Sequence, residues 1–159
     1  MERLWAPWRM SYIKNANKAK GCLFCRVLRS KKDKENLVLL RSEHSFAVLN
    51  IYPYNNGHLM ASPKRHVISI ELLNDAEICD LINTVKKAKL LLDRVLKPEG
   101  YNIGINVGRA AGAGIIGHLH IHIVPRWNGD TNFMPILSNA KIISQSLNEL
   151  YRKLTRGRE

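Results

Sequence analysis

The segment His118–Val124 alternates three histidines with branched aliphatic side chains, and this alternation constrains the fold more than any other feature of the chain. In a β-strand, successive side chains point to opposite faces. The three imidazoles therefore share one face, and Leu119, Ile121 and Ile123 share the other. The aliphatic face can pack on a core, while the other presents ring nitrogens that titrate near neutral pH. A row of histidines indicates a metal or catalytic site, the alternative being a histidine-rich strand without chemistry.

A small, glycine-rich stretch from Asn106 to Gly114 precedes these histidines. Glycine lets the backbone approach a ligand closely and offer its N–H groups to phosphate oxygens. The stretch has no Gly-Lys-Ser/Thr and leads into a strand, which excludes a P-loop and a dinucleotide-binding fingerprint. A plain hairpin turn is the alternative, but beside three aligned histidines the stretch indicates a phosphate site.

The chain resembles the histidine triad (HIT) family of nucleotide hydrolases and transferases. The resemblance rests on the alternating histidines at 118–124 with their glycine-rich loop, and it extends over roughly residues 22 to 127. Weaker matches fall in the right order at Ala47–Asn50, Gly57–His66 and Val124–Arg126. Two further stretches, Arg3–Met10 and Trp127–Phe133, resemble the branch of the family that includes bacterial diadenosine tetraphosphate phosphorylases.

The order of expected elements predicts an α+β fold with a mostly antiparallel sheet. Strands are expected at 37–41, 45–50, 58–63, 101–107 and 118–124, the last two as an antiparallel pair. One long central helix is expected from the capping box at Asn74–Glu77 to Pro98, and a C-terminal helix over 138–153. Cys79 lies in the apolar helical stretch, so it is expected in the core. The resemblance implies the HIT-like fold, commonly a two-fold dimer.

Composition and charge narrow the class of protein. Residues 1–20 are interpreted as an N-terminal arm anchored by Trp5 and Trp8, and residues 21–159 as a single domain. There is no run of roughly 18 or more apolar residues and no apolar signal segment, so we expect a cytoplasmic protein without a membrane anchor. The formal net charge of +12 implies anionic partners. Because charge runs usually belong to solvated faces, we expect a nucleotide rather than nucleic acid, although charge alone does not exclude weak nucleic-acid binding.

The motif Cys22-Leu23-Phe24-Cys25 has three interpretations: half of a zinc site, a redox pair, or two unrelated thiols. The strand-to-helix context of a thioredoxin-like redox pair is absent. By resemblance, family members with an upstream Cys-x-x-Cys use it with two histidines as zinc ligands, and Cys22, Cys25, His66 and His118 match that set. Four protein ligands close a tetrahedral site, so the expected zinc is structural. Reduced cysteines with a surface histidine are the alternative.

The resemblance also assigns roles within the expected nucleotide site. His120 corresponds to the nucleophile that attacks the α-phosphorus and forms a nucleotidyl-imidazole. His122 is placed to bond phosphate oxygens or to help protonate the leaving group. Asn50 matches the ribose-binding position and His58 a histidine near the pocket; the alternatives are a strand-terminating asparagine and a buried histidine satisfied by backbone. The remaining expected phosphate contacts are Asn106, Gly112 and Gly114.

The loop before the histidines departs from the better-known branches of the family, which carry Gln, Ser or Thr there. Residues 113–117 offer no side-chain donor, so backbone N–H groups would have to replace it. The leading hypothesis is an enzyme that cleaves dinucleoside polyphosphates, such as diadenosine tetraphosphate, through a nucleotidyl-His120 intermediate with phosphate or water as acceptor. The alternatives are a nucleoside phosphoramidase of the same family and a zinc-stabilised binding module without turnover.

Overall fold

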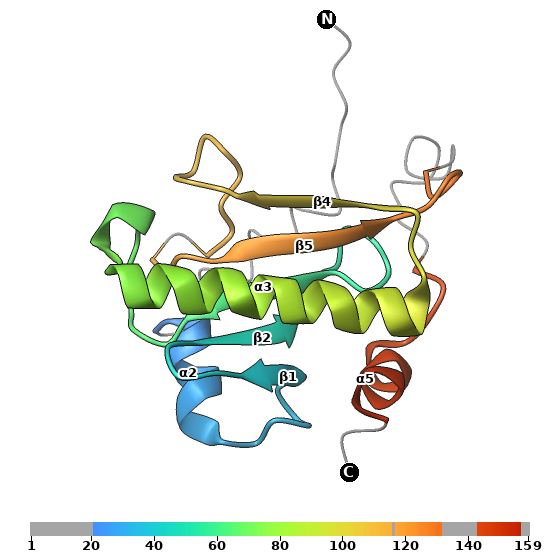
Figure 1. Cartoon of the computed structure of the whole chain (residues 1–159), viewed down its shortest axis with the longest axis horizontal. Helices are drawn as coiled ribbons and strands as arrows, with labels where there is room; N and C mark the ends of the chain where they lie inside the picture. Colours follow the sequence, from blue (N-terminus) through green and yellow to red (C-terminus); the bar gives the residue numbers. More distant parts are fainter. Residues whose placement is uncertain (1–20, 116, 132–142, 157–159) are drawn as a thin grey trace, which may run out of the picture.

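In the computed structural model, which describes residues 21–115, 117–131 and 143–156, five strands form one antiparallel sheet (Figure 1). The strand order across the sheet is β1-β2-β3-β5-β4. The strands are β1 (Val38–Arg41), β2 (Ser45–Leu49), β3 (Leu59–Pro63), β4 (Gly100–Ile105) and β5 (Ile121–Arg126). The helices are α2 (Leu23–Ser30), the short 3-10 helix η1 (Ile70–Leu72), α3 (Asp75–Leu96) and α5 (Leu147–Thr155). The predicted α+β fold with an antiparallel sheet and a long central helix is confirmed.

The long helix α3 begins at the predicted capping box. The Asn74 side chain accepts the backbone N–H of Glu77 at 2.9 Å, and the Glu77 carboxylate accepts the backbone N–H of Asn74 at 3.0 Å. These bonds satisfy two backbone donors that have no partner inside the helix. The helix ends at Leu96, and Lys97 adopts a left-handed conformation (φ 47°) directly before Pro98. Local sequence alone therefore sets both ends of the central helix.

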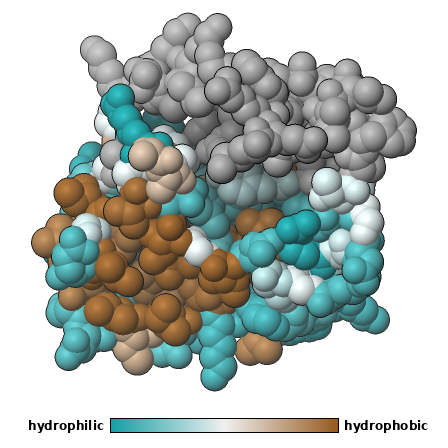
Figure 2. All heavy atoms as spheres, turned by 90° about the horizontal axis from the view of Figure 1, so that it is seen from above, coloured by the Kyte–Doolittle hydropathy of each residue, from teal (hydrophilic) through white to brown (hydrophobic). Residues whose placement is uncertain are grey.

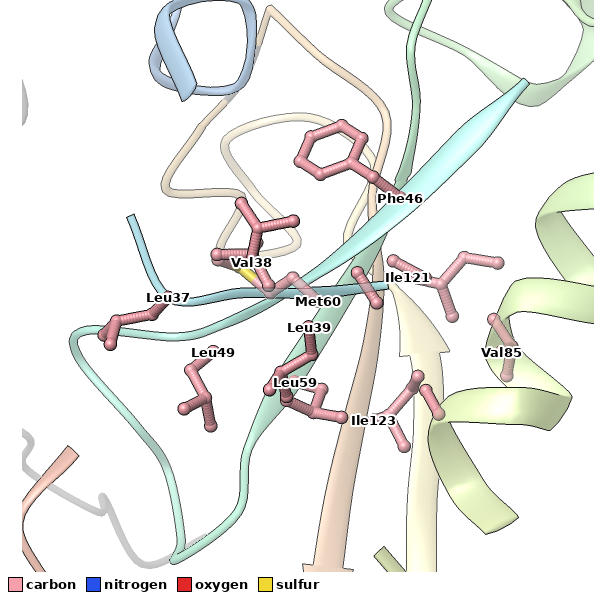
Figure 3. Close-up of a cluster of buried hydrophobic side chains, with 14 of the residues drawn as sticks. Leu37, Val38, Leu39, Phe46, Leu49, Leu59, Met60, Val85, Ile121 and Ile123 are labelled. Atoms are coloured by element: carbon pink, nitrogen blue, oxygen red, sulfur yellow. The ribbon is translucent and has the colours of Figure 1, made fainter. Parts of the chain in front are cut away.

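The main core lies between α3 and the sheet (Figure 3). Val85 from the helix faces apolar side chains of the sheet, including Leu59 and Ile123 (Figure 3). Leu119, Ile121 and Ile123, the aliphatic partners of the histidines, are all buried in this core. The alternation along 118–124 thus places the histidines on the face of the sheet away from α3.

Several local predictions were wrong. The C-terminal helix begins at Leu147 with Ser146 as its N-cap, and residues 143–146 are not helical; the predicted start at 138 lies outside the described residues. Strand β5 begins at Ile121, so two of the three histidines precede its regular pairing. Cys79 is exposed on α3 because it lies on the helix face that points away from the sheet. The predicted arm, residues 1–20, lies outside the described residues.

Helix α2 was not predicted. Cys22 is its N-cap residue, and Phe24 and Val27 are its buried side chains.

No helix among the described residues is both long and apolar enough to cross a membrane.

Candidate active site and metal centre

A cavity of about 490 Å³ opens beside His120 and His122, on the side of the sheet away from α3. Its size falls within the range of small-molecule sites. One wall comes from α2, and another comes from the end of β2 and the turn that follows it. Besides the two histidines, the lining includes Leu23, Phe24, Arg26, Val27, Glu35, Asn36, Asn50, Tyr52, Tyr54, Gly114 and Ile115.

His120 is buried with one ring nitrogen fixed by the backbone. Its Nδ1 lies 2.8 Å from the carbonyl oxygen of His118. A carbonyl can only accept, so Nδ1 carries the proton and donates it, which leaves a lone pair on Nε2. Burial lowers the pKa of His120 and keeps the ring neutral. The ring of Phe24 packs against the imidazole with centroids 5.3 Å apart and limits its rotation.

His58 and His122 form a directed pair behind this nucleophile candidate. The backbone N–H of Tyr54 donates to Nδ1 of His58 at 3.0 Å, so the proton of His58 resides on Nε2. That Nε2–H donates to Nδ1 of His122 at 2.9 Å. In its neutral form, His122 therefore carries its proton on Nε2, which lies 3.4 Å from Nδ2 of Asn106. Because both nitrogens are then donors, they do not hydrogen-bond to each other. Burial, reinforced by the neighbouring His122 and His120, lowers the pKa of His58 to about 3.

The other residues predicted to contact the nucleotide do not all line the cavity. Asn50 is buried at the end of β2 and lines the cavity; its Oδ1 accepts the backbone N–H of Tyr52 at 2.9 Å. Gly114 also lines the cavity. Gly112 does not, and it donates its N–H to the carbonyl of Arg109 at 2.9 Å within the loop.

Two aromatic residues near the histidines were missed by reasoning from sequence. The ring of Tyr54 stacks on His122, with centroids 5.5 Å apart and planes 30° apart, and also lies 4.6 Å from the ring of His58. Phe24 touches the rings of both His118 and His120. The only available signal was position, since Phe24 stands between the two cysteines and Tyr54 stands in the turn before His58.

The four predicted zinc ligands come together in one cluster. The ligand atoms of Cys22, Cys25, His66 and His118 all lie within 4.8 Å of one another. Three separations are given by Cys22 Sγ to His118 Nδ1 (3.2 Å), Cys25 Sγ to His66 Nδ1 (3.4 Å) and Cys25 Sγ to His118 Nδ1 (3.7 Å). Tetrahedral zinc bound by two sulfurs and two nitrogens needs ligand separations of about 3.3–3.8 Å.

The ring of His118 is oriented for such a site. Its Nε2 donates to the carbonyl oxygen of Pro63 at 2.9 Å, so Nδ1 carries a lone pair directed at the thiols. Residues from the start of α2, the segment after β3 and the segment before β5 thus converge on one point that could hold a metal ion.

Comparison with known proteins agrees with this geometry. The HIT domain family model matches residues 31–129, well over half of the chain. This chain belongs to the HIT domain family. It is 40% identical over 161 residues to an AP-4-A phosphorylase of Mycobacterium tuberculosis, covering 97% of this chain and 83% of that protein. It is 34% identical over 108 residues to an adenosine 5'-monophosphoramidase of Schizosaccharomyces pombe, covering 68% of this chain and 76% of that protein.

The fold of this HIT protein also matches solved structures. One is a hypothetical histidine triad nucleotide-binding protein of Sulfolobus tokodaii, with a TM-score of 0.67 and 29% identity, covering 84% of this chain and 88% of that chain. The HIT-like fold expected from the sequence is therefore confirmed.

Proposed function

We propose that this HIT protein cleaves dinucleoside polyphosphates, with diadenosine tetraphosphate as the leading substrate, by transferring a nucleotidyl group to His120. The observation that carries the proposal is the state of this side chain. Its Nδ1–H donates to the His118 carbonyl oxygen, so its Nε2 carries the lone pair that a nucleophile needs. The same side chain lines a cavity of the size that a nucleotide requires. The similarity to an AP-4-A phosphorylase supports the choice of substrate.

In the first step, Nε2 of His120 forms a bond to the α-phosphorus while the bridging P–O bond breaks and ATP leaves. The ring becomes cationic in this intermediate, and the His118 carbonyl that accepts its Nδ1–H stabilises that charge. The Nε2–H of His122, set by His58, supplies a proton or hydrogen bond to the departing oxygen. In the second step, an oxygen of inorganic phosphate attacks the phosphorus, the N–P bond breaks, and ADP is released with the free imidazole. Water in place of phosphate would give AMP.

The cavity residues supply the contacts that orient the nucleotide. Asn50, at the end of β2, is assigned to the ribose hydroxyls. Asn106 and the backbone of Gly114 are assigned to the phosphates, with Gly112 shaping the loop rather than lining the cavity. The base is assigned to the apolar wall that α2 provides. Nothing in this arrangement calls for nucleic acid as a partner.

The cluster of Cys22, Cys25, His66 and His118 is proposed to hold a structural zinc ion. The donor set and its separations fit tetrahedral zinc, and four protein ligands leave no position for substrate. Zinc there would supply no reaction chemistry but would fasten α2 to the segment that carries the histidines.

Reduced thiols suit a cytoplasmic location. We take residues 21–159 as one domain and residues 1–20 as an arm.

A homodimer is proposed through the edge strand β4. This strand ends the sheet in the part of the chain that the structure describes, so one of its sides has no strand partner. Tyr101 donates its hydroxyl to Asp93 of α3 at 2.7 Å, so Ile103, two residues on, lies on the same face. Ile103 is exposed, as are Ile82 and Leu90 of α3. Figure 2, a view onto this edge, shows hydrophobic side chains gathered on one side of the surface.

Pairing of two β4 edges would cover these apolar side chains. Light scattering should give twice the chain mass, and Ile103→Lys should shift the protein to monomer. Leu72→Lys, at an equally exposed apolar position on η1, should stay dimeric.

The catalytic proposal is tested by incubating the protein with diadenosine tetraphosphate, with and without inorganic phosphate, and separating the nucleotides. ATP plus ADP formed only with phosphate identifies a phosphorylase, and ATP plus AMP without phosphate identifies a hydrolase. His120→Ala should abolish turnover, while the half-exposed His44→Ala, away from the cavity, should retain it. Faster turnover of adenosine 5'-monophosphoramidate would favour a phosphoramidase, the activity named for the yeast relative. No turnover of either substrate would leave only the binding-module alternative.

A further inference from the structure

The turn that follows β5, Trp127–Asp130, takes no direct part in the chemistry above, yet it contains a buried carboxylate. The Asp130 side chain is only 7% exposed. It accepts bonds from Nε and Nη2 of Arg126 at 2.6 and 2.9 Å, and from the backbone N–H of Trp127 at 3.1 Å. The Arg126 guanidinium holds the pKa of Asp130 well below its usual range, so the carboxylate stays ionised. Bidentate arginine–carboxylate pairs of this kind have a fixed geometry.

The same carboxylate binds the segment between β2 and β3. Asn55 donates from Nδ2 to Asp130 at 2.8 Å, and the same nitrogen donates to the carbonyl oxygen of Pro125 at 3.0 Å. An amide NH₂ has two hydrogens, so both are used. Asn55 is buried, and its own segment contains only bends and turns. Pro125 and Asp130, at the end of β5 and just after it, therefore hold in place a segment that is not itself part of a helix or strand.

The segment that Asn55 fixes is the one that sets the state of His58 and His122. Immediately before Asn55, the Tyr54 backbone N–H fixes the tautomer of His58, and the Tyr54 ring stacks on His122. The carbonyl oxygen of Asn55 itself accepts the backbone N–H of His58 at 3.2 Å. His58 then donates to His122. A continuous set of contacts thus leads from Asp130, through Asn55 and the segment 54–58, to His122.

We propose that Asp130 is a positioning residue for His122. It acts by holding Asn55, and thereby the Tyr54 ring and the His58 imidazole, in the geometry that directs the Nε2–H of His122 toward the leaving group. This inference rests on the proposed function for its effect on catalysis, but not for its effect on the histidines. Displacing a catalytic group by about 1 Å can cost on the order of 100-fold in rate.

The test uses the full-length protein with Asp130→Asn and Asn55→Ala, each alone and combined. Asp130→Asn keeps the shape but removes the charge, and Asn55→Ala removes the link while leaving the pair of Arg126 and Asp130 intact. Asp33→Asn is the control, because Asp33 likewise accepts bonds from Nε and Nη2 of an arginine, Arg41, and is not among the residues that line the cavity.

Two measurements are made. Nitrogen-15 NMR of the histidine rings, without substrate, should show altered His58 and His122 signals in both site variants and unchanged signals in the control. With diadenosine tetraphosphate and phosphate, kcat should fall about 10- to 100-fold while KM changes little. The double variant should be no slower than the slower single one, since both break the same link.

Unchanged ring signals in the folded site variants would overturn the proposal. It would also be overturned if the fold-loss in kcat of the double variant equalled the product of the two single losses, since the two residues would then act independently. If one variant does not fold, as judged by its melting curve, the other still decides. If the wild-type protein does not turn over diadenosine tetraphosphate, the proposed function fails by itself, and the NMR signals alone confirm or refute the positioning role.

Discussion

At the scale of single residues, the burial of His58 links the site to the stability of the fold. Its folded-state pKa is about 3, against 6.5 for an unperturbed histidine. Between these pH values the unfolded chain binds a proton at this residue and the folded protein does not. Protonation therefore favours the unfolded state, and stability is lost as the pH falls from 6.5 toward 3. The loss is at most about 1.4 kcal/mol per pH unit.

We predict that the free energy of unfolding falls more steeply between pH 7 and pH 5 in the wild-type protein than in His58→Gln. The difference should reach about 2 kcal/mol at pH 5, because only the wild-type side chain takes up a proton on unfolding. Urea titrations at the two pH values measure it. Equal losses in both proteins would show that His58 does not have a lowered pKa in the folded state.

How far the site could be predicted depends on whether a residue's role follows from its local pattern. The histidines at 118–122 repeat with the period of a strand, so their common face could be predicted from their spacing alone. The Cys22-x-x-Cys25 motif could likewise be recognised from its spacing in the sequence. Asp130 and Tyr54 act through contacts with residues more than 60 positions away in the chain, and no periodicity marks them. Such contacts appear only when the fold brings the segments together.

At the scale of elements, the segment between β2 and β3 depends on Gly57. Its backbone φ of +78° is one that residues with a side chain rarely adopt. A Cβ at this position would also lie 2.6 Å from Cδ1 of Leu96 and 3.1 Å from Cγ of Pro125. We predict that Gly57→Ala lowers the free energy of unfolding by about 1–3 kcal/mol. Gly104→Ala, where a Cβ would meet nothing within 4 Å, should change it by less than about 0.5 kcal/mol. Chemical denaturation compares the two, and equal effects would refute the steric explanation.

The elements that could be predicted are those with strong local signals. The capping box and Pro98 define α3, and Asn74 makes both bonds expected of it. Helix α2 has only eight residues, begins at a cysteine without a side-chain cap, and carries its buried face on Phe24 and Val27. It is stabilised by packing rather than by propensity, so sequence reasoning missed it. The start of α5 was misplaced because both Ser138 and Ser146 are suitable N-cap residues, and the bond from Glu149 identifies Ser146.

At the scale of the whole molecule, the proposed zinc ion would join three parts that are distant in sequence. Cys22 and Cys25 belong to the start of α2, His66 follows β3, and His118 precedes β5. An ion that binds only the folded protein stabilises it by about 4 kcal/mol when its concentration is 1,000 times its dissociation constant. For a chain of this size, that corresponds to a melting temperature higher by about 10 °C.

We therefore predict that removing the metal with a chelator lowers the melting temperature by about 10 °C, and that added zinc restores it. Cys22→Ser should melt near the chelated wild type and respond little to zinc. Cys79→Ser, which changes an exposed thiol outside the cluster, should behave as the wild type does. Because α2 also forms a wall of the cavity, the metal-free protein should bind adenosine nucleotides more weakly, which calorimetry can measure. A melting temperature unaffected by chelation, with metal removal verified by elemental analysis, would mean that packing alone holds α2 against the sheet.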